Sequence, residues 1–85
     1  MSNQEPVNAV IIPETLDVAA IRLKTRATAY MPYTQANFAR MIGVPAGTLR
    51  QWEQRRRKPT GAARVLLALL DREPDIISRT LARPT

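Results

Sequence analysis

The chain has 85 residues, with 13 Lys and Arg against 7 Asp and Glu, so its formal net charge is +6. That length suits one small domain. The positive charge favours an anionic partner, nucleic acid first, although it is equally compatible with a merely solubilising surface. Without His, Cys or a glycine-rich phosphate loop, the chain lacks the usual metal-ligand clusters and nucleophile–base pairs, so we expect no enzyme, no metal and no cofactor. There is no long apolar run, no secretory signal and no disulfide, which favours a cytoplasmic location.

Residues 1–13 are expected to be an N-terminal extension that is flexible or binds a partner. They include an apolar, β-branched run from Val7 to Ile12, which Pro13 closes. Two interpretations of this run stay open. It is a short extended segment that packs on the domain or pairs with a strand of another protein, or it is a hydrophobic clip on the first helix.

The segment ETLDVAAIRLKTRATA, after Pro13, predicts a first helix that ends before Pro32. Two acidic residues near its start and two basic residues near its end complement the helix dipole: Glu14, Asp17, Lys24 and Arg26. Helical spacing predicts that its apolar stripe, flanked by Ile21, consists of Leu16, Ala19, Ala20, Leu23 and Ala27.

Two short helices joined by a tight turn are predicted between Gln35 and Trp52. Thr34 suits the N-cap of the first helix, Gly43 can end it with a positive φ, and Pro45 suits the first turn of the second. The apolar and small residues that share the buried side of this pair are expected to be Phe38, Ala39, Ile42, Val44, Leu49 and Trp52.

Two further helices are predicted in the last third of the chain. One opens at residues 60–64, ends at residues 71–73 and should bury Val65, Leu66, Leu69 and Leu70. The last runs from Asp75 to Ala82. A domain of this size is not expected to bury all of its apolar residues, Ile76, Ile77 and Leu81, so they form either a dimer interface or part of the monomer core.

The stretch TQANFARMIGVPAGTLRQWEQRRRKPTGAARVLLALLDREPDII resembles the Xre/Cro-type helix-turn-helix family, in particular the HigA-like antitoxins. Their pattern is close to SQ-x-x-FA-x-x-(L/I)GV-x-x-x-TL-x-x-WE-x-GRR-x-P-x-GPAR-x-LL, and the resemblance runs from about Val18 to Leu81. It implies an all-α, five-helix, lambda-repressor-like domain over residues 14–85 that binds operator DNA as a homodimer and represses its own operon. It also implies a RelE/HigB-like toxin as partner, in a type II toxin–antitoxin pair, and a structural contact between Glu53 and an arginine of the first helix, Arg22 or else Arg26.

The chain departs from that pattern in three places. The connection through residues 29–33 is longer, so either the first helix or the loop is extended, and its two tyrosines are expected to cover the core. Arg55 stands where relatives have glycine, so it adopts a left-handed conformation at a cost of about 1 kcal/mol, or the helix runs on. Small residues, Ala46 and Gly47, replace longer polar ones at the start of the second paired helix.

The outward face of that helix supplies the candidate DNA contacts. Arg50 and Gln51 can pair with guanine and adenine edges, whereas Ala46 and Gly47 would let the backbone approach the bases, leaving part of the specificity to DNA shape. The residues expected at phosphates are Gln35, whose contact the resemblance implies, and Thr48, Gln54, Arg55, Arg56, Arg57 and Lys58.

Two other functions compete with the antitoxin interpretation. One is a stand-alone phage-type or plasmid-type repressor without a toxin. The other is a protein-interaction module that has lost DNA binding, which the small residues at positions 46 and 47 would fit.

Overall fold

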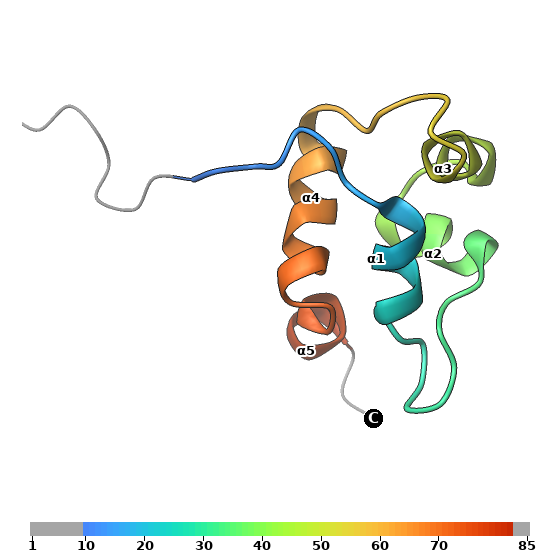
Figure 1. Cartoon of the computed structure of the whole chain (residues 1–85). Coiled ribbons are helices and arrows are strands. Elements are labelled where there is room, and N and C mark those ends of the chain that lie inside the picture. Colours follow the sequence, from blue (N-terminus) through green and yellow to red (C-terminus); the bar gives the residue numbers. More distant parts are fainter. Residues whose placement is uncertain (1–9, 83–85) are drawn as a thin grey trace, which may run out of the picture.

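A computed structural model describes residues 10–82, and within that range the chain is all-helical, as expected (Figure 1). Its five helices are α1 (Val18–Lys24), α2 (Gln35–Ile42), α3 (Ala46–Glu53), α4 (Gly61–Arg72) and α5 (Ile76–Leu81). The β-structure in this range is a single isolated bridge between Arg26 and Pro32. Most of the N-terminal extension, residues 1–9, lies outside the described range. Residues 10–13 border a shallow groove on α4 before the chain enters α1, and Figure 1 shows the start of this segment leading away from the helices.

Helix α1 is much shorter than the sequence predicted. It begins after Asp17, whose carboxylate accepts a hydrogen bond from the Ala20 N–H at 3.0 Å. It ends at Lys24, because Thr25 leaves the helical conformation and donates its hydroxyl to the Ile21 carbonyl at 2.7 Å. Which face of these two turns points inward is set by α3 and α4, the helices that contact α1.

The predicted stripe of α1 is therefore wrong. The fully buried residues of this helix are Val18 and Ile21. Of the predicted stripe, Leu16 and Ala19 are half-buried, whereas Ala20, Leu23 and Ala27 are exposed.

The extra residues between α1 and α2 lengthen the loop, not the helix. Ala27 and Thr28 donate their N–H groups to the Met31 carbonyl, at 3.0 and 3.2 Å. The Thr28 hydroxyl accepts bonds from the N–H groups of Tyr30 and Met31. Tyr33 packs against Phe38, with ring centroids 6.1 Å apart, so the expected role in covering the core holds for this tyrosine. It is wrong for Tyr30, which is exposed at the loop tip.

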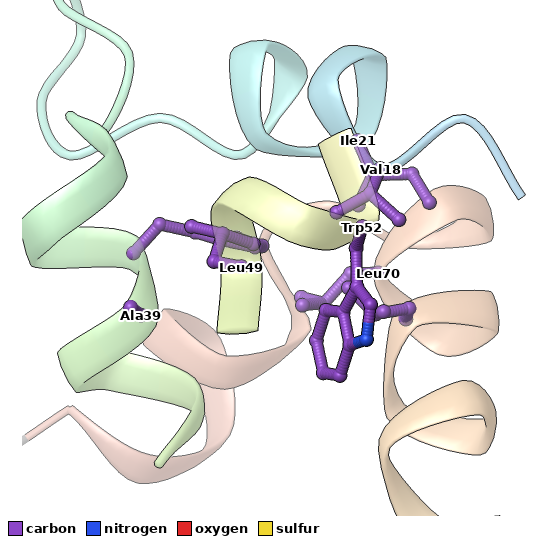
Figure 2. Close-up of a cluster of buried hydrophobic side chains, with 8 residues drawn as sticks. Val18, Ile21, Ala39, Leu49, Trp52 and Leu70 are labelled. Atoms are coloured by element: carbon purple, nitrogen blue, oxygen red, sulfur yellow. The ribbon is translucent and has the colours of Figure 1, made fainter. Parts of the chain in front are cut away.

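The paired helices α2 and α3 follow the sequence prediction closely. The Thr34 side chain caps α2 by accepting the Asn37 N–H, and Gly43 ends it with φ 81°. Pro45 lies one position earlier than expected, as the N-cap of α3. Leu49 and Trp52 of α3 are buried, together with Phe38 and Ala39 of α2, and they meet the α1 residues in the core (Figure 2).

Helix α4 begins and ends where expected, and half of its predicted stripe is confirmed. Leu70 is fully buried and Leu66 packs against the core. The prediction is wrong for Val65 and Leu69, which are 41% and 45% exposed, while Leu67, outside the stripe, is fully buried. In α5, Ile76 and Ile77 pack against the core, and Leu81 is 75% exposed.

Candidate nucleic-acid interface

Helix α3 is held by two buried side chains and turns its other residues outward. Leu49 and Trp52 point into the core (Figure 2). The base-reading candidates share the opposite side: Arg50 is exposed and Gln51 is half-exposed. Gly47 is also half-exposed, and a Cβ added there would lie 3.8 Å from the Arg50 guanidinium, so this arginine folds back along the helix. Ala46 is half-buried and packs partly against the core, which leaves less of it to face a ligand.

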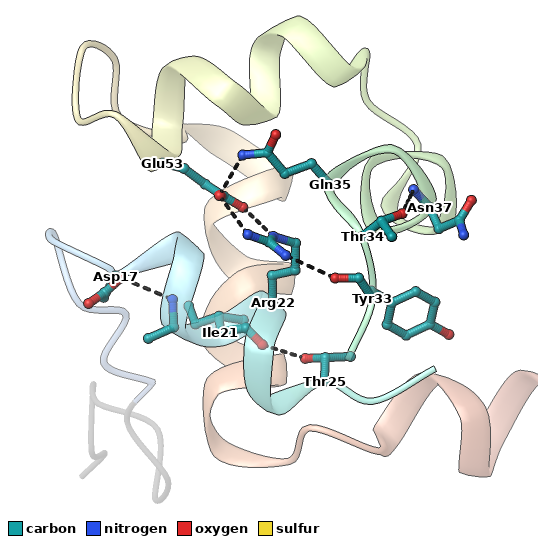
Figure 3. A network of polar contacts seen from close by, with 10 residues as sticks. Asp17, Ile21, Arg22, Thr25, Tyr33, Thr34, Gln35, Asn37 and Glu53 are labelled. Atoms are coloured by element: carbon teal, nitrogen blue, oxygen red, sulfur yellow. Dashed lines mark hydrogen bonds and ion pairs between the residues drawn. The ribbon is translucent and has the colours of Figure 1, made fainter. Parts of the chain in front are cut away.

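One partly buried ionic network fixes α3 relative to α1 and α2 (Figure 3). Arg22 of α1 donates to both carboxylate oxygens of Glu53, at 2.7 and 3.1 Å, and to the Tyr33 carbonyl at 2.9 Å. Gln35 of α2 donates its amide to the same carboxylate at 2.8 Å. The expected pairing of Glu53 is confirmed with Arg22, the first of the two arginines considered. The network fixes the end of α3 on its two neighbours.

The network also shifts the ionisation of both charged partners. Burial by itself raises the pKa of the Glu53 carboxyl, but hydrogen bonds from Arg22 and Gln35 and the Arg22 charge outweigh it, so its pKa lies below the ordinary 4.5. The hydrogen bond to Glu53 raises the pKa of Arg22 in turn. Both groups therefore stay charged at neutral pH.

Arg55 resolves the two alternatives for the end of α3. Its φ is 61°, so it adopts the left-handed conformation and the helix stops at Glu53. The Arg56 N–H donates to the Gln51 carbonyl at 2.9 Å and the Arg55 N–H to the Trp52 carbonyl at 3.1 Å, the two bonds of a Schellman motif. The side chains that follow are all exposed: Arg55, Arg56, Arg57 and Lys58.

The chain after this turn comes back beside α3 and encloses a polar hollow. The hollow lies between Thr48 and Gln51 of α3 and Arg57, Lys58 and Thr60 of the α3–α4 loop. Two cations, two hydroxyls and an amide thus share one concave surface next to the outward face of α3. Such a surface can receive a phosphate-bearing ligand through charge-assisted hydrogen bonds. The sequence did not single out Thr60, because its place beside α3 depends on the path of the loop.

The remaining residues expected at phosphates differ in their exposure to solvent. Gln54 is exposed and Thr48 is half-exposed, both close to the basic run. Gln35 is half-buried, and its amide nitrogen is engaged with Glu53. This bond could not be predicted from local sequence patterns, because Gln35 and Glu53 are 18 positions apart.

The described residues contain no group of three or more side chains suited to hold a metal ion. None of the helices in residues 10–82 is long and apolar enough to cross a membrane. Comparisons with known family models, with curated proteins and with solved structures find no match for this chain.

Proposed function

We propose that α2 and α3 act as a helix-turn-helix that binds double-stranded DNA sequence-specifically, with α3 in the major groove. The observation that carries the proposal is the joint placement of an outward polar face on α3 and a run of exposed cations directly after it. Arg50 and Gln51 have the donors and acceptors that distinguish base edges in the major groove. The cations from Arg55 to Lys58 supply the attraction for phosphates that positions such a helix.

The inner side of α3 supports the same assignment. Leu49 and Trp52 fix its rotation, and the bonds of Glu53 to Arg22 and Gln35 fix its end. A helix that is anchored in this way presents its outer face with little freedom, which is what a base-reading element requires. The small Gly47 and Ala46 bring the backbone, not long side chains, close to the groove.

Within this proposal the chain is a repressor that acts as a homodimer. The resemblance to HigA-like antitoxins supports a RelE/HigB-like toxin as its second partner. A stand-alone repressor and a protein-interaction module without DNA binding remain the competing functions.

Fluorescence anisotropy tests DNA binding directly. The full chain is titrated onto duplex DNA from upstream of its own gene and onto a scrambled duplex of the same composition, at several salt concentrations. We expect preference for the first duplex, and a log–log salt slope that changes by about 0.9 for each phosphate neutralised. Arg50→Ala and Gln51→Ala should each weaken the preference by roughly 5- to 150-fold, the equivalent of about 1–3 kcal/mol for one bidentate base contact.

The matched control for Arg50→Ala is Arg26→Ala. Both arginines are exposed, but Arg26 belongs to the loop that leaves α1 at the end away from α3 (Figure 1). Its loss should change the affinity only slightly. Equal binding to both duplexes by the wild type and by both α3 variants would reject the DNA-reading role, and the interaction-module function would then be preferred.

A further inference from the structure

The basic run from Arg55 to Lys58 borders two concave surfaces. Arg57 and Lys58 line the polar hollow beside α3. The same two cations, together with Arg55, also line a narrower cleft that is shared with residues 14–16, the segment that leads into α1. The cations that can meet a ligand in the hollow therefore also lie close to the chain before α1.

The chain at this point carries two carboxylates. Glu14 is exposed and lines the cleft. Asp17 forms an ion pair with Arg55, with a carboxylate oxygen 3.6 Å from a guanidinium nitrogen. Within residues 10–82, Asp17 is the one acidic residue that pairs with the basic run at 4.0 Å or less. Two negative charges thus lie on the side of the basic run that the hollow does not occupy.

These carboxylates do not fix the conformation of the basic run. The Asp17–Arg55 pair is exposed on both sides, and such pairs contribute little to the folded structure. The backbone of the run is fixed instead by the N–H bonds of Arg55 and Arg56 to α3 and by Pro59, which is buried. The remaining effect of the two carboxylates is that of their charge, which attracts the cations and repels phosphates over about 8 Å at physiological ionic strength.

We propose that Glu14 and Asp17 compete with DNA phosphates for the basic run, and so hold the DNA affinity below the value that the cations alone would give. A phosphate that contacts Arg55 either displaces the Asp17 carboxylate or lies beside it, and both lower the net gain. The inference rests on the proposed function and deepens it, because it adds two residues that regulate the same site without contacting the DNA.

The variant Asp17→Asn tests the competition. Asn is as good an N-cap as Asp, so the start of α1 should be kept while the charge is removed. In fluorescence anisotropy with the full chain, the variant should bind both the upstream duplex and the scrambled duplex about 1.5- to 5-fold more tightly, the equivalent of one exposed ion pair. Glu14→Gln should act in the same direction.

A salt series adds a second readout. The gain from Asp17→Asn should shrink as salt is added, because the Debye length falls from about 10 Å at 0.1 M to about 3 Å at 1 M. The matched control is Asp71→Asn, which removes one negative charge and breaks an exposed ion pair with Lys24. Asp71 lies near the end of α4 that is away from the basic run, so its replacement should leave the affinity nearly unchanged (Figure 1).

Unchanged or weaker binding by an Asp17→Asn variant with wild-type urea stability would overturn the proposal, as would an equal gain in Asp71→Asn. If Asp17→Asn is destabilised, Glu14→Gln decides in its place. Preference for the upstream duplex without a gain in the variants rejects the competition alone. A gain on both duplexes without any preference rejects the sequence-reading role alone, and no binding by any of the proteins rejects both.

Discussion

Helices α2 and α3 end in the same backbone geometry with different residues. In α2 the left-handed position is Gly43, φ 81°, and the Val44 N–H donates to the Ala39 carbonyl at 3.0 Å. In α3 it is Arg55, φ 61°, with the equivalent bond from Arg56. Glycine adopts this conformation without strain, whereas a side chain makes it cost about 1–2 kcal/mol. The end of α2 thus depends on its glycine, whereas the end of α3 keeps the same left-handed geometry although its residue is an arginine.

The two helix ends differ in the side-chain bonds that they receive from other helices. The residue just before the second end, Glu53, is bound by Arg22 and Gln35 from two other helices. No comparable charged anchor among the described residues holds the end of α2. Strain at one position is tolerated where neighbouring contacts determine the conformation. The side chain of Arg55 reaches toward Asp17 at the start of α1, 3.6 Å away, and the next cations, Arg57 and Lys58, line the hollow beside α3.

The largest effect is expected from removing that anchor. Glu53→Gln keeps an acceptor for Gln35 but leaves the mostly buried Arg22 charge unpaired, and it should lower the free energy of unfolding by about 2–3 kcal/mol. Urea denaturation followed by circular dichroism measures the change. Glu73→Gln is the control, because the Glu73–Arg79 ion pair is exposed to solvent and its loss should change the stability little. Equal effects of the two changes would mean that Glu53 does not anchor α3.

The next effect concerns the glycine end. Gly43→Ala should destabilise the protein by about 1–2 kcal/mol. A Cβ at this position would meet no atom within 4 Å, so the loss would come from the backbone conformation and not from a clash. The same urea measurement applies. A neutral result would show that the end of α2 is as firmly held from outside as the end of α3.

The arginine end should respond in the opposite direction. Arg55→Gly removes the strain and should stabilise the fold by up to about 1 kcal/mol. Its exposed ion pair with Asp17, at 3.6 Å, is worth little and only partly offsets that gain. Under the proposed function the same variant should bind DNA more weakly, with a log–log salt slope smaller by about 0.9. Stabilisation without any change in the salt slope would separate Arg55 from the DNA contacts.

The smallest effect is a loss of stability in acid. The pKa of Glu53 is lowered in the folded protein, so its ionised form stabilises the fold above pH 4.5. This contribution should be lost as the pH falls below 4.5 and through the lowered pKa. Urea midpoints of the wild type and of Glu53→Gln should differ less at pH 3 than at pH 7. A constant difference between the two would exclude ionisation of Glu53 as its source.

Local chemistry explains which parts of the fold were predictable from the sequence. The Thr34 cap, the Gly43 turn and the buried Leu49–Trp52 pair each depend on residues within a few positions of one another, and all were confirmed. The predicted inward face of α1 was wrong, and that of α4 was right only for Leu66 and Leu70, because burial there depends on which elements pack against each helix.

The contacts of the candidate site were likewise predictable only in part. The Arg22–Glu53 bond was anticipated through a resemblance, whereas the bond from Gln35 and the approach of Thr60 to α3 arise only in the folded chain. The assignment of Arg50, Gln51 and the basic run to DNA stays a prediction.

The loop between α1 and α2 offers a practical use. The hydrogen bonds of Ala27, Thr28 and Met31 have both donor and acceptor within the loop. Tyr30 projects from the tip of the loop into solvent. Extra residues inserted at such a tip would lengthen the turn without pulling on the helices at either side. A fluorescent dye or a short epitope tag placed between Ala29 and Tyr30 would therefore report on the protein from a position well separated from α3 (Figure 1).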